Sequence, residues 1–101
     1  MEGVDCIAVL KALSEISRLR ILRLLLKDAH DVQEIAAKAG LSHYNASKHL
    51  RILREARLVE TTREGKHRVY ALAEELRDHL EANRNVLRLK CCTFRFDKLP
   101  K

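Results

Sequence analysis

The sequence has little of what marks membrane proteins, loop-rich proteins or enzymes. One proline and three glycines among 101 residues leave little room for long loops. Its apolar runs are far too short to cross a bilayer, and the segment around Glu2 and Asp5 lacks the basic start and apolar core of a signal peptide. No Ser/His/Asp arrangement, glycine-rich phosphate loop or pair of acids stands out. We therefore expect a cytoplasmic protein that is not an enzyme and has no membrane partner.

What the sequence does contain is a globular balance of apolar and charged residues. Hydrophobic residues make up 47% and charged residues 34%, and a chain of this length is a single domain that dimerisation would help to stabilise. The net charge of +6 indicates a polyanion as partner. Residues 42–68 hold seven Lys or Arg against three Glu, and residues 84–101 hold six against one Asp. A solvated basic surface is the alternative reading of this charge.

Apolar spacing and capping residues predict four helices before residue 57. Ser14 is the expected cap of the second helix, which is apolar on most sides and therefore buried. Asp31, with Glu34 three residues later, forms a capping box at the start of the third helix. Gly40 ends the third helix, and Ser42 caps the fourth. The expected ranges are roughly 3–13, 16–27, 32–39 and 42–56.

After residue 56 the hydrophobic period changes to that of a strand. Residues 58–63 are rich in β-branched side chains, and residues 67–72 alternate polar and apolar, so both are expected to be strands. Gly65 lies in the turn between them. Leucines at positions 76, 80 and 87 predict a last helix over residues 74–88. We expect a DNA-binding and dimerisation domain over residues 1–88 and a C-terminal tail with a cysteine pair over residues 89–101.

The third and fourth predicted helices and the following hairpin have the pattern of a winged helix-turn-helix domain. A short helix, a tight glycine turn and a longer capped helix form the helix-turn-helix unit, whose second helix enters the major groove of DNA. The expected fold is mainly α with a small β-hairpin: four helices, two strands and a final helix. An ordinary helical hairpin with a polar face is the alternative, but a hairpin placed where a wing belongs argues against it.

The candidate DNA-binding residues are polar or cationic side chains on the outward side of the fourth helix and at the tip of the wing. Such side chains read base edges and hold phosphates. On the helix they are His43, Tyr44, Asn45, Ser47, Lys48 and Arg51. On the wing they are Arg63, Lys66, His67 and Arg68.

Three segments together resemble the ArsR family of bacterial winged-helix repressors. Residues 12–22 resemble the family's ALADPTRLRIL segment, residues 35–59 its recognition helix, and residues 64–72 its wing. The resemblance implies a homodimer that has the first and last helices at its interface and binds a palindromic double-stranded DNA operator. It also implies repression that is relieved by a metal, a metalloid or a redox event. His49 matches a recurrent histidine of the recognition helix, for which we expect packing or a phosphate contact.

The metal sites implied by the resemblance are not matched in this sequence. A thiolate site on the third helix would need cysteines where Asp31 and Gln33 stand. A zinc site on the last helix would need ligands where Leu76 and Lys90 stand. His79 is alone on its predicted helix, and we expect it at the surface in solvent.

Three cysteines remain as a candidate sensor: Cys6, Cys91 and Cys92. Soft thiolates bind As(III) or another thiophilic metal ion. In the dimer that the resemblance implies, the first helix and the end of the last one lie at the interface, so a three-thiolate site could form there. An odd number of cysteines in a reducing compartment makes a structural disulfide framework unexpected. Redox sensing and inert thiols are the alternatives.

The sequence therefore predicts a homodimeric, sequence-specific DNA-binding transcriptional repressor that a thiol-binding metal or metalloid, or an oxidant, releases from DNA. The alternative is a winged-helix module for nucleic-acid or protein contacts that has no inducer.

Overall fold

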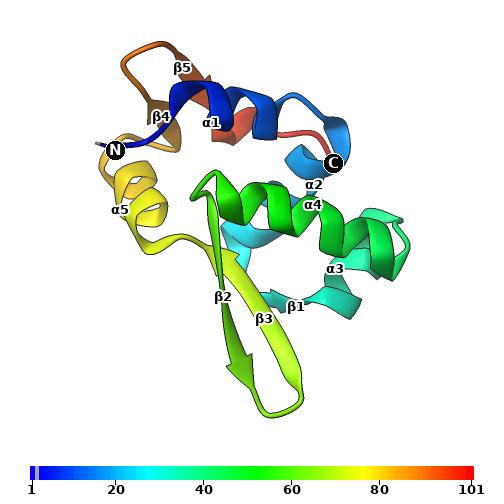
Figure 1. Cartoon of the computed structure of the whole chain (residues 1–101). Coiled ribbons are helices and arrows are strands. Elements are labelled where there is room, and N and C mark those ends of the chain that lie inside the picture. The colour runs from blue at the N-terminus through cyan, green and yellow to red at the C-terminus, as the bar shows by residue number, and fades with distance from the viewer. Residues whose placement is uncertain (2) are drawn as a thin grey trace.

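The computed structural model describes residue 1 and residues 3–101, and over these residues five α-helices gather into one body from which a β-hairpin projects (Figure 1). The helices are α1 (Cys6–Leu13), α2 (Ile16–Lys27), α3 (Val32–Ala39), α4 (His43–Glu55) and α5 (Glu74–Ala82). The strands are β1 (His30–Asp31), β2 (Val59–Glu64), β3 (His67–Leu72), β4 (Val86–Arg88) and β5 (Thr93–Arg95), with a 3-10 helix η1 (Phe96–Lys98) after them. The predicted mainly α fold with a β-hairpin is confirmed. None of the described helices is long and apolar enough to span a membrane.

Side-chain caps explain where the first two helices begin. The Asp5 carboxylate accepts hydrogen bonds from two backbone amides at 3.0 and 3.3 Å, so α1 begins at Cys6 and not at residue 3 as expected. Glu15, and not Ser14, caps α2 in the same way, at 3.0 and 3.3 Å. The Ser14 hydroxyl instead donates to the carbonyl of Lys11 at 2.7 Å and helps to end α1. The prediction of Ser14 as the cap of α2 was wrong, because the serine serves the preceding helix.

Three antiparallel strands form the wing and fasten it to the helices. β3 lies between β1 and β2, with Val69 opposite Asp31 on one side and Thr62 on the other. The predicted hairpin is confirmed, although its first strand runs one residue later than expected, from Val59 to Glu64. β1 was not predicted, because two residues are too few to show a period. Through β1, the wing is attached to the residue that caps α3.

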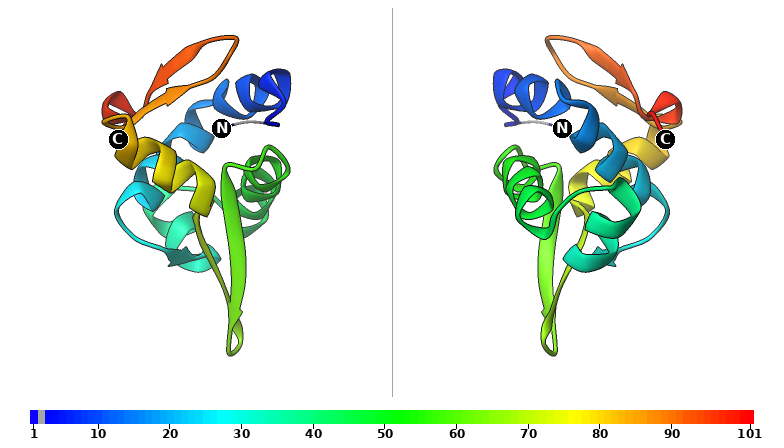
Figure 2. Two further views of the ribbon diagram at one scale, coloured as in Figure 1. Left: turned by 90° about the vertical axis from the view of Figure 1, so that its left-hand side faces the viewer. Right: turned by 90° about the vertical axis from the view of Figure 1, so that its right-hand side faces the viewer.

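The hydrophobic core joins the five helices to the root of the wing. Each helix contributes at least one side chain with 0% exposure, among them Val9, Ile21, Ile35, Leu50 and Leu76. β2 and β3 add buried side chains, among them Val59 and Leu72, from the end of the wing nearest the helices. The elements share one core, which joins the helix-turn-helix to the base of the wing. Figure 2 shows their arrangement from two sides.

The last helix is shorter than the sequence predicted. α5 ends at Ala82 and not at residue 88, and Arg84 and Asn85 then adopt left-handed backbone conformations with φ of 55° and 64°. A right-handed helix cannot continue through two such residues. Leu87, whose spacing suggested a helical face, is fully buried from strand β4. Leucine spacing was misleading here because a buried strand can present an apolar side chain at the same position.

The C-terminal residues pack onto the rest of the chain. β4 and β5 form a hairpin with Val86 opposite Arg95, and η1 buries Phe96 at 1% exposure. The rings of Phe94 and Phe96 meet edge to face, with centroids 5.7 Å apart. The hairpin lies with α1 at the end of the molecule opposite the wing tip (Figures 1 and 2). The expected boundary between residues 1–88 and the tail falls inside this hairpin.

Candidate nucleic-acid interface

Local hydrogen bonds fix the angle between α3 and α4. Asp31 accepts from the Glu34 amide at 2.8 Å, and the Glu34 carboxylate accepts from the Asp31 amide at 3.1 Å, which is the predicted capping box. Gly40 is left-handed with φ of 67°, and the Leu41 amide donates to the carbonyl of Ala36 at 2.9 Å. These contacts close α3 and direct the chain into α4, so the two helices form a helix-turn-helix unit.

α4 is packed by its apolar side, which leaves its polar side exposed. Ala46, Leu50 and Leu53 are all 0% exposed, and the hydroxyl of the N-cap residue Ser42 accepts from the amide of Asn45 at 3.1 Å. Tyr44 is 75% exposed. The helix residues predicted to contact DNA lie at the surface, with Ser47 half-buried and the others exposed: His43, Tyr44, Asn45, Ser47, Lys48 and Arg51. The Arg51 guanidinium pairs with Glu55 at 3.2 Å, one turn further along the same helix.

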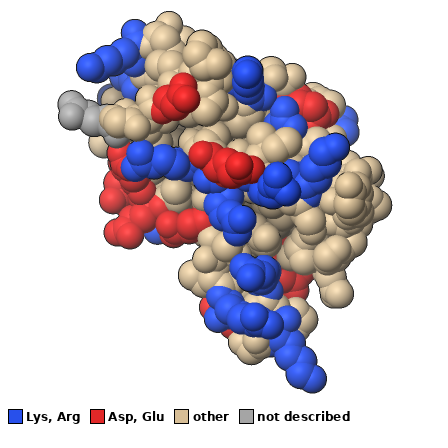
Figure 3. All heavy atoms as spheres, viewed as in Figure 1, with Lys and Arg blue, Asp and Glu red and all other residues tan. Residues whose placement is uncertain are grey.

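Two arginines lie opposite each other on the two strands of the wing. Arg63 of β2 and Arg68 of β3 are directly opposite each other, and both are exposed. Gly65, with φ of 62°, and Lys66 form the two-residue turn at the tip. Like charges opposite each other destabilise a sheet, so this arrangement favours a bound polyanion. Lys and Arg side chains extend along the projecting wing to its tip in Figure 3.

His67, the fourth predicted wing residue, has a partner in the helix-turn-helix. Its side chain is 61% exposed, and its Nδ1 lies 3.5 Å from Oδ2 of Asp31, the residue that caps α3. This contact and the β1–β3 pairing join β3 to the start of α3. The wing is therefore held at a defined position beside α4.

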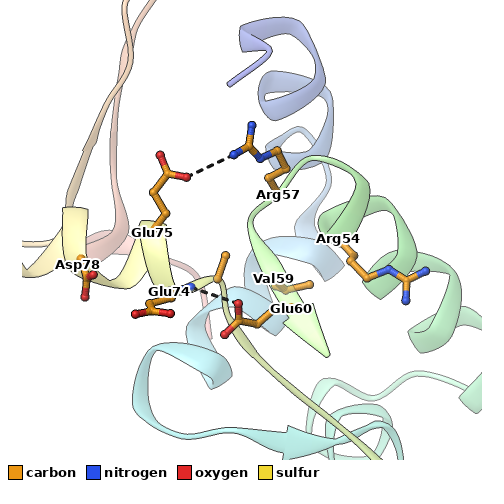
Figure 4. Close-up of a pocket in the computed structure, with 8 residues that line it drawn as sticks. Arg54, Arg57, Val59, Glu60, Glu74, Glu75 and Asp78 are labelled. Atoms are coloured by element: carbon orange, nitrogen blue, oxygen red, sulfur yellow. Dashed lines mark hydrogen bonds and ion pairs between the residues drawn. The ribbon is translucent and has the colours of Figure 1, made fainter. Parts of the chain in front are cut away.

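A hollow lined by both acidic and basic side chains lies where the end of α4, the start of β2 and the start of α5 meet (Figure 4). Arg57 donates to Glu75 at 3.4 Å, and the backbone amide of Glu74 donates to Glu60 at 3.4 Å. The charged residues that line the hollow are Arg54, Arg57, Glu60, Glu74, Glu75 and Asp78. Acidic side chains also gather on the α5 side of the molecule in Figure 3. Four acidic side chains against two arginines make this hollow unfavourable for a polyanion, in contrast to the candidate interface on α4 and the wing.

The three cysteines meet at the end of the molecule opposite the wing tip. Cys6 and Cys91 form a disulfide with their Cα atoms 6.4 Å apart, which contradicts the expectation that no structural disulfide is present. Cys92 is free, and its Sγ lies 3.7 Å from that of Cys91. The cluster predicted from Cys6, Cys91 and Cys92 is thus assembled within one chain. Over residue 1 and residues 3–101, no three His, Cys, Asp or Glu side chains are arranged to hold a metal ion.

Two histidines have partners that the sequence did not reveal. His79 was expected in solvent, but it is half-buried and its Nε2 accepts from the Arg88 amide at 2.9 Å, which anchors β4 to α5. Burial lowers the pKa of His79, and the positive charges of the N-terminus and Arg88 act in the same direction. His49 is also half-buried, and its Nδ1 lies 3.1 Å from Nη1 of Arg18. The sequence analysis did not identify Arg18 as the partner of His49. The signal that could have pointed to it is the presence of a guanidinium on a mostly apolar helix, because such a group needs a partner.

The helix-turn-helix with an exposed polar face, followed by a basic β-hairpin in register, defines a winged helix-turn-helix protein. Residues 16–61 of this chain match the family described as "Bacterial regulatory protein, arsR family". The solved homodimeric winged helix-turn-helix DNA-binding domain of Mb0332 from Mycobacterium bovis has a TM-score of 0.69 at 33% identity, covering 83% of this chain and 86% of that chain. The chain belongs to the ArsR family, which is a family of regulatory proteins and not of enzymes.

Two curated relatives agree with this assignment. The transcriptional repressor SmtB homolog of Synechocystis is 37% identical over 78 residues, which are 69% of this chain and 59% of that protein. The HTH-type transcriptional regulator CmtR of Mycobacterium tuberculosis is 42% identical over 64 residues, which are 63% of this chain and 54% of that protein. The chain thus spans less than two thirds of the length of the curated relatives it matches.

Proposed function

We propose that this protein is a sequence-specific DNA-binding transcriptional repressor that acts as a homodimer in the cytoplasm. The observation that carries the proposal is the exposed polar face of α4 beside a wing on which Arg63 and Arg68 lie opposite each other. An acid-rich hollow elsewhere on the surface restricts the orientation in which DNA can approach. The repressor and DNA-binding functions of the named relatives support the same conclusion.

In this proposal α4 lies in the major groove and the wing lies along the backbone or in the minor groove. The first turns of a recognition helix meet base edges, and residues further along it hold phosphates. The contacts from α4 are made by His43, Tyr44, Asn45, Ser47, Lys48 and Arg51. The contacts from the wing, which give a salt-dependent affinity, are made by Arg63, Lys66, His67 and Arg68.

The proposed dimer is centred on α1. Ile7 and Leu10, three residues apart on α1, are 60% and 39% exposed, and adjacent exposed apolar side chains mark an interaction surface. In α5, by contrast, Leu76 and Leu80 are buried within their own chain at 0% and 2% exposure. α1 therefore supplies the apolar part of the interface, and any contact of α5 across it is polar.

Fluorescence anisotropy tests the DNA-binding proposal. The probe is a labelled duplex from upstream of the protein's own gene, and the control is a shuffled duplex of equal length and composition. We expect binding to the first to be tighter by about a thousandfold, with a steep dependence on salt. Equal affinity for the two duplexes would favour a nucleic-acid module without sequence specificity. Failure to bind either duplex would favour a protein-binding module.

We also propose that thiol chemistry at Cys6, Cys91 and Cys92 releases the protein from DNA. In support, the three sulfurs meet beside α1, the helix on which the proposed dimer is built. An oxidant can take two electrons from the Cys6 and Cys91 thiols, which lose two protons and form the disulfide. Alternatively, As(III) or another thiophilic metal ion can bind the three thiolates of the reduced protein.

The same DNA titration separates these two chemistries. We expect weaker binding by the oxidised protein than by the reduced protein if the oxidant is the signal. If the metalloid is the signal, near-stoichiometric arsenite should release the reduced protein, and a variant with Cys91→Ser and Cys92→Ser should not respond. Equal affinity in the reduced, oxidised and arsenite-treated states would contradict the thiol proposal and leave the repressor proposal in place.

A further inference from the structure

Arg18 of α2 joins the end of α1 to the middle of α4. Its Nε donates to the carbonyl of Ala12 at 2.7 Å and its Nη2 to that of Lys11 at 3.0 Å, both near the end of α1. Its Nη1 lies 3.1 Å from Nδ1 of His49. A guanidinium suits a helix C-terminus, because the last carbonyls have no partner within the helix and carry partial negative charge. One side chain therefore ties the helix of the proposed dimer to the helix proposed to read DNA.

The contact with Arg18 favours one protonation form of His49. A guanidinium has donors only, so a hydrogen bond from Arg18 requires Nδ1 to accept, which corresponds to a neutral ring with its proton on Nε2. The His49 side chain is 18% exposed. Burial lowers the pKa of His49, the charges of Arg18 and Lys48 act in the same direction, and the charge of Glu15 opposes them. Burial and the contact together favour a neutral ring at neutral pH.

Glu15 is positioned to receive the protonated ring. Its Oε2 lies 3.6 Å from Nδ1 of His49, and the same oxygen caps α2. Once protonated, Nδ1 cannot accept from Arg18, and two cations would be in contact. A proton on Nδ1 therefore exchanges the Arg18 contact for one with Glu15. The charged groups that act on the ring are Glu15 and Arg18 from α2 and Lys48 from α4, while α1 presents backbone carbonyls to Arg18.

The Arg18 contact is directional, whereas most of the packing of α4 is not. Ala46, Leu50 and Leu53 seat the helix through apolar burial, which allows small rotations and shifts at little cost. A hydrogen bond requires a narrow range of distance and angle. His49 also follows directly after Lys48, one of the residues proposed to contact DNA. A shift of the His49 ring therefore shifts the cationic face of α4.

We infer that Arg18 and His49 are positioning residues that hold α4 in its DNA-binding orientation while His49 is neutral, and that uptake of a proton by His49 transfers the ring to Glu15 and weakens DNA binding. The inference rests on the proposed function, because it names a pH-dependent control of the same recognition helix. Arg18 acts from α2, on the side of α4 that packs against the core.

A pH series of DNA titrations tests the inference. The probe is the labelled upstream duplex, and the pH runs from about 8 to about 5.5, where histidines titrate. His49→Asn places an amide oxygen where Nδ1 stands, so it can accept from Arg18 but takes up no proton. We expect wild type and His49→Asn to bind alike at the upper pH. The ratio of their Kd values should rise about tenfold toward the lower pH, the factor that one hydrogen bond to a charged group provides.

Comparison with His49→Asn removes the contribution of the other histidines. The two proteins differ only at residue 49, so the contributions of all other residues are common to both and cancel in the ratio. His49→Leu, which has no acceptor, should bind about tenfold more weakly than wild type at the upper pH and about as weakly as wild type at the lower pH. A ratio that stays constant within about twofold across the series would overturn the inference.

Variants of the guanidinium supply a second line of evidence. Arg18→Lys keeps the charge but loses the fork that reaches α1 and α4 together, so it should lower DNA affinity and flatten the pH profile. Arg20→Lys, on the same helix, changes a guanidinium that donates to the carbonyl of Lys101 and should behave as wild type. Equal effects of the two substitutions would contradict a specific role for Arg18.

Nitrogen-15 NMR of the histidine rings distinguishes failure of this inference from failure of the proposed function. At the upper pH we expect His49 with its proton on Nε2, and at the lower pH a charged ring, whether or not DNA is bound. If the protein shows this spectrum but binds no duplex, the proposed function is contradicted, while the contact between Arg18 and His49 is still supported. A ring protonated on Nδ1 at the upper pH would overturn the inference even if DNA binding is strong.

Discussion

At the scale of single residues, the candidate interface contains two kinds of side chain in the described structure. Some already pair with a carboxylate, and others do not. Arg51 pairs with Glu55 at 3.2 Å, and His67 pairs with Asp31 at 3.5 Å. Arg63 and Arg68 instead face each other across the wing. If these residues contact DNA as proposed, Arg51 exchanges a carboxylate for DNA, whereas the wing arginines gain a partner without losing one.

Arg51→Ala should weaken binding to the upstream duplex by about tenfold or more, because a hydrogen bond to a charged group such as a phosphate contributes about 1.5–3 kcal/mol. Stability should hardly change, since an exposed ion pair contributes about 0–1 kcal/mol. Anisotropy and thermal unfolding measure the two effects. Glu55→Gln is the matched variant: it frees Arg51 and removes a negative charge, so it should tighten binding. If Arg51→Ala binds as wild type does, α4 does not use this residue to contact DNA.

His79 should make stability depend on pH. Its folded-state pKa is lowered, first by burial and then by the N-terminus and Arg88, so folding favours the neutral ring. The stabilisation is present above the unfolded-state pKa of about 6.5 and is lost as the pH falls through the folded-state pKa. His79→Leu should remove this part of the pH dependence and lower the free energy of unfolding near neutral pH by about 1 kcal/mol, through the lost bond from the Arg88 amide. Urea unfolding at several pH values tests this, and parallel pH curves would contradict it.

At the scale of elements, the sequence predicts those helices and strands whose signals are local. The bounds of α2, α3 and β3 agree with the prediction, because caps, a glycine turn and alternation act over a few residues. The end of α5 was wrong because left-handed residues at 84 and 85 carry no strong sequence signal. The disulfide and the Arg18–His49 contact join residues 85 and 31 positions apart, respectively, and no local pattern encodes such pairings.

The candidate interface was more predictable than the candidate sensor for the same reason. The outward face of α4 follows from helical periodicity once Ser42 is recognised as the cap, and the wing tip follows from Gly65. Which cysteines meet depends instead on how the C-terminal hairpin folds back beside α1, and that hairpin was not predicted.

The wing as an element should set the salt dependence of binding. Replacing Lys66 and Arg68 together by Ala should reduce the slope of log K against log salt concentration by about 2, since each phosphate contact contributes about 1. Affinity should fall similarly for the upstream and shuffled duplexes, because phosphates carry no sequence. Anisotropy at several salt concentrations measures both quantities. Replacing Lys27 and Lys38, which lie outside the proposed interface, is the control for net charge. If both double variants change the slope equally, the wing makes no specific phosphate contact.

At the scale of the whole molecule, the two ends have different roles in the proposal. The wing projects from one end of the molecule, while α1, the C-terminal hairpin and the three cysteines lie together at the other (Figure 2). The Cys6–Cys91 disulfide fixes the C-terminal hairpin to the start of α1. At the other end of α1, Arg18 donates to two backbone carbonyls, and it also contacts His49 of α4. A change at the cysteines is thus connected to the DNA-reading helix through α1 and Arg18.

Dimerisation through α1 provides the last test at this scale. Ile7→Glu places a charge in the exposed apolar surface of α1 without disturbing the core, because this side chain is 60% exposed in the protomer. We expect a folded monomer by sedimentation, with an unchanged circular dichroism spectrum. DNA affinity should fall steeply, since two half-sites are no longer bound together. Gln33→Glu, an equal change of charge on exposed α3, should stay dimeric. If Ile7→Glu remains a dimer, the interface lies elsewhere, and the cysteines beside α1 lose their connection to assembly.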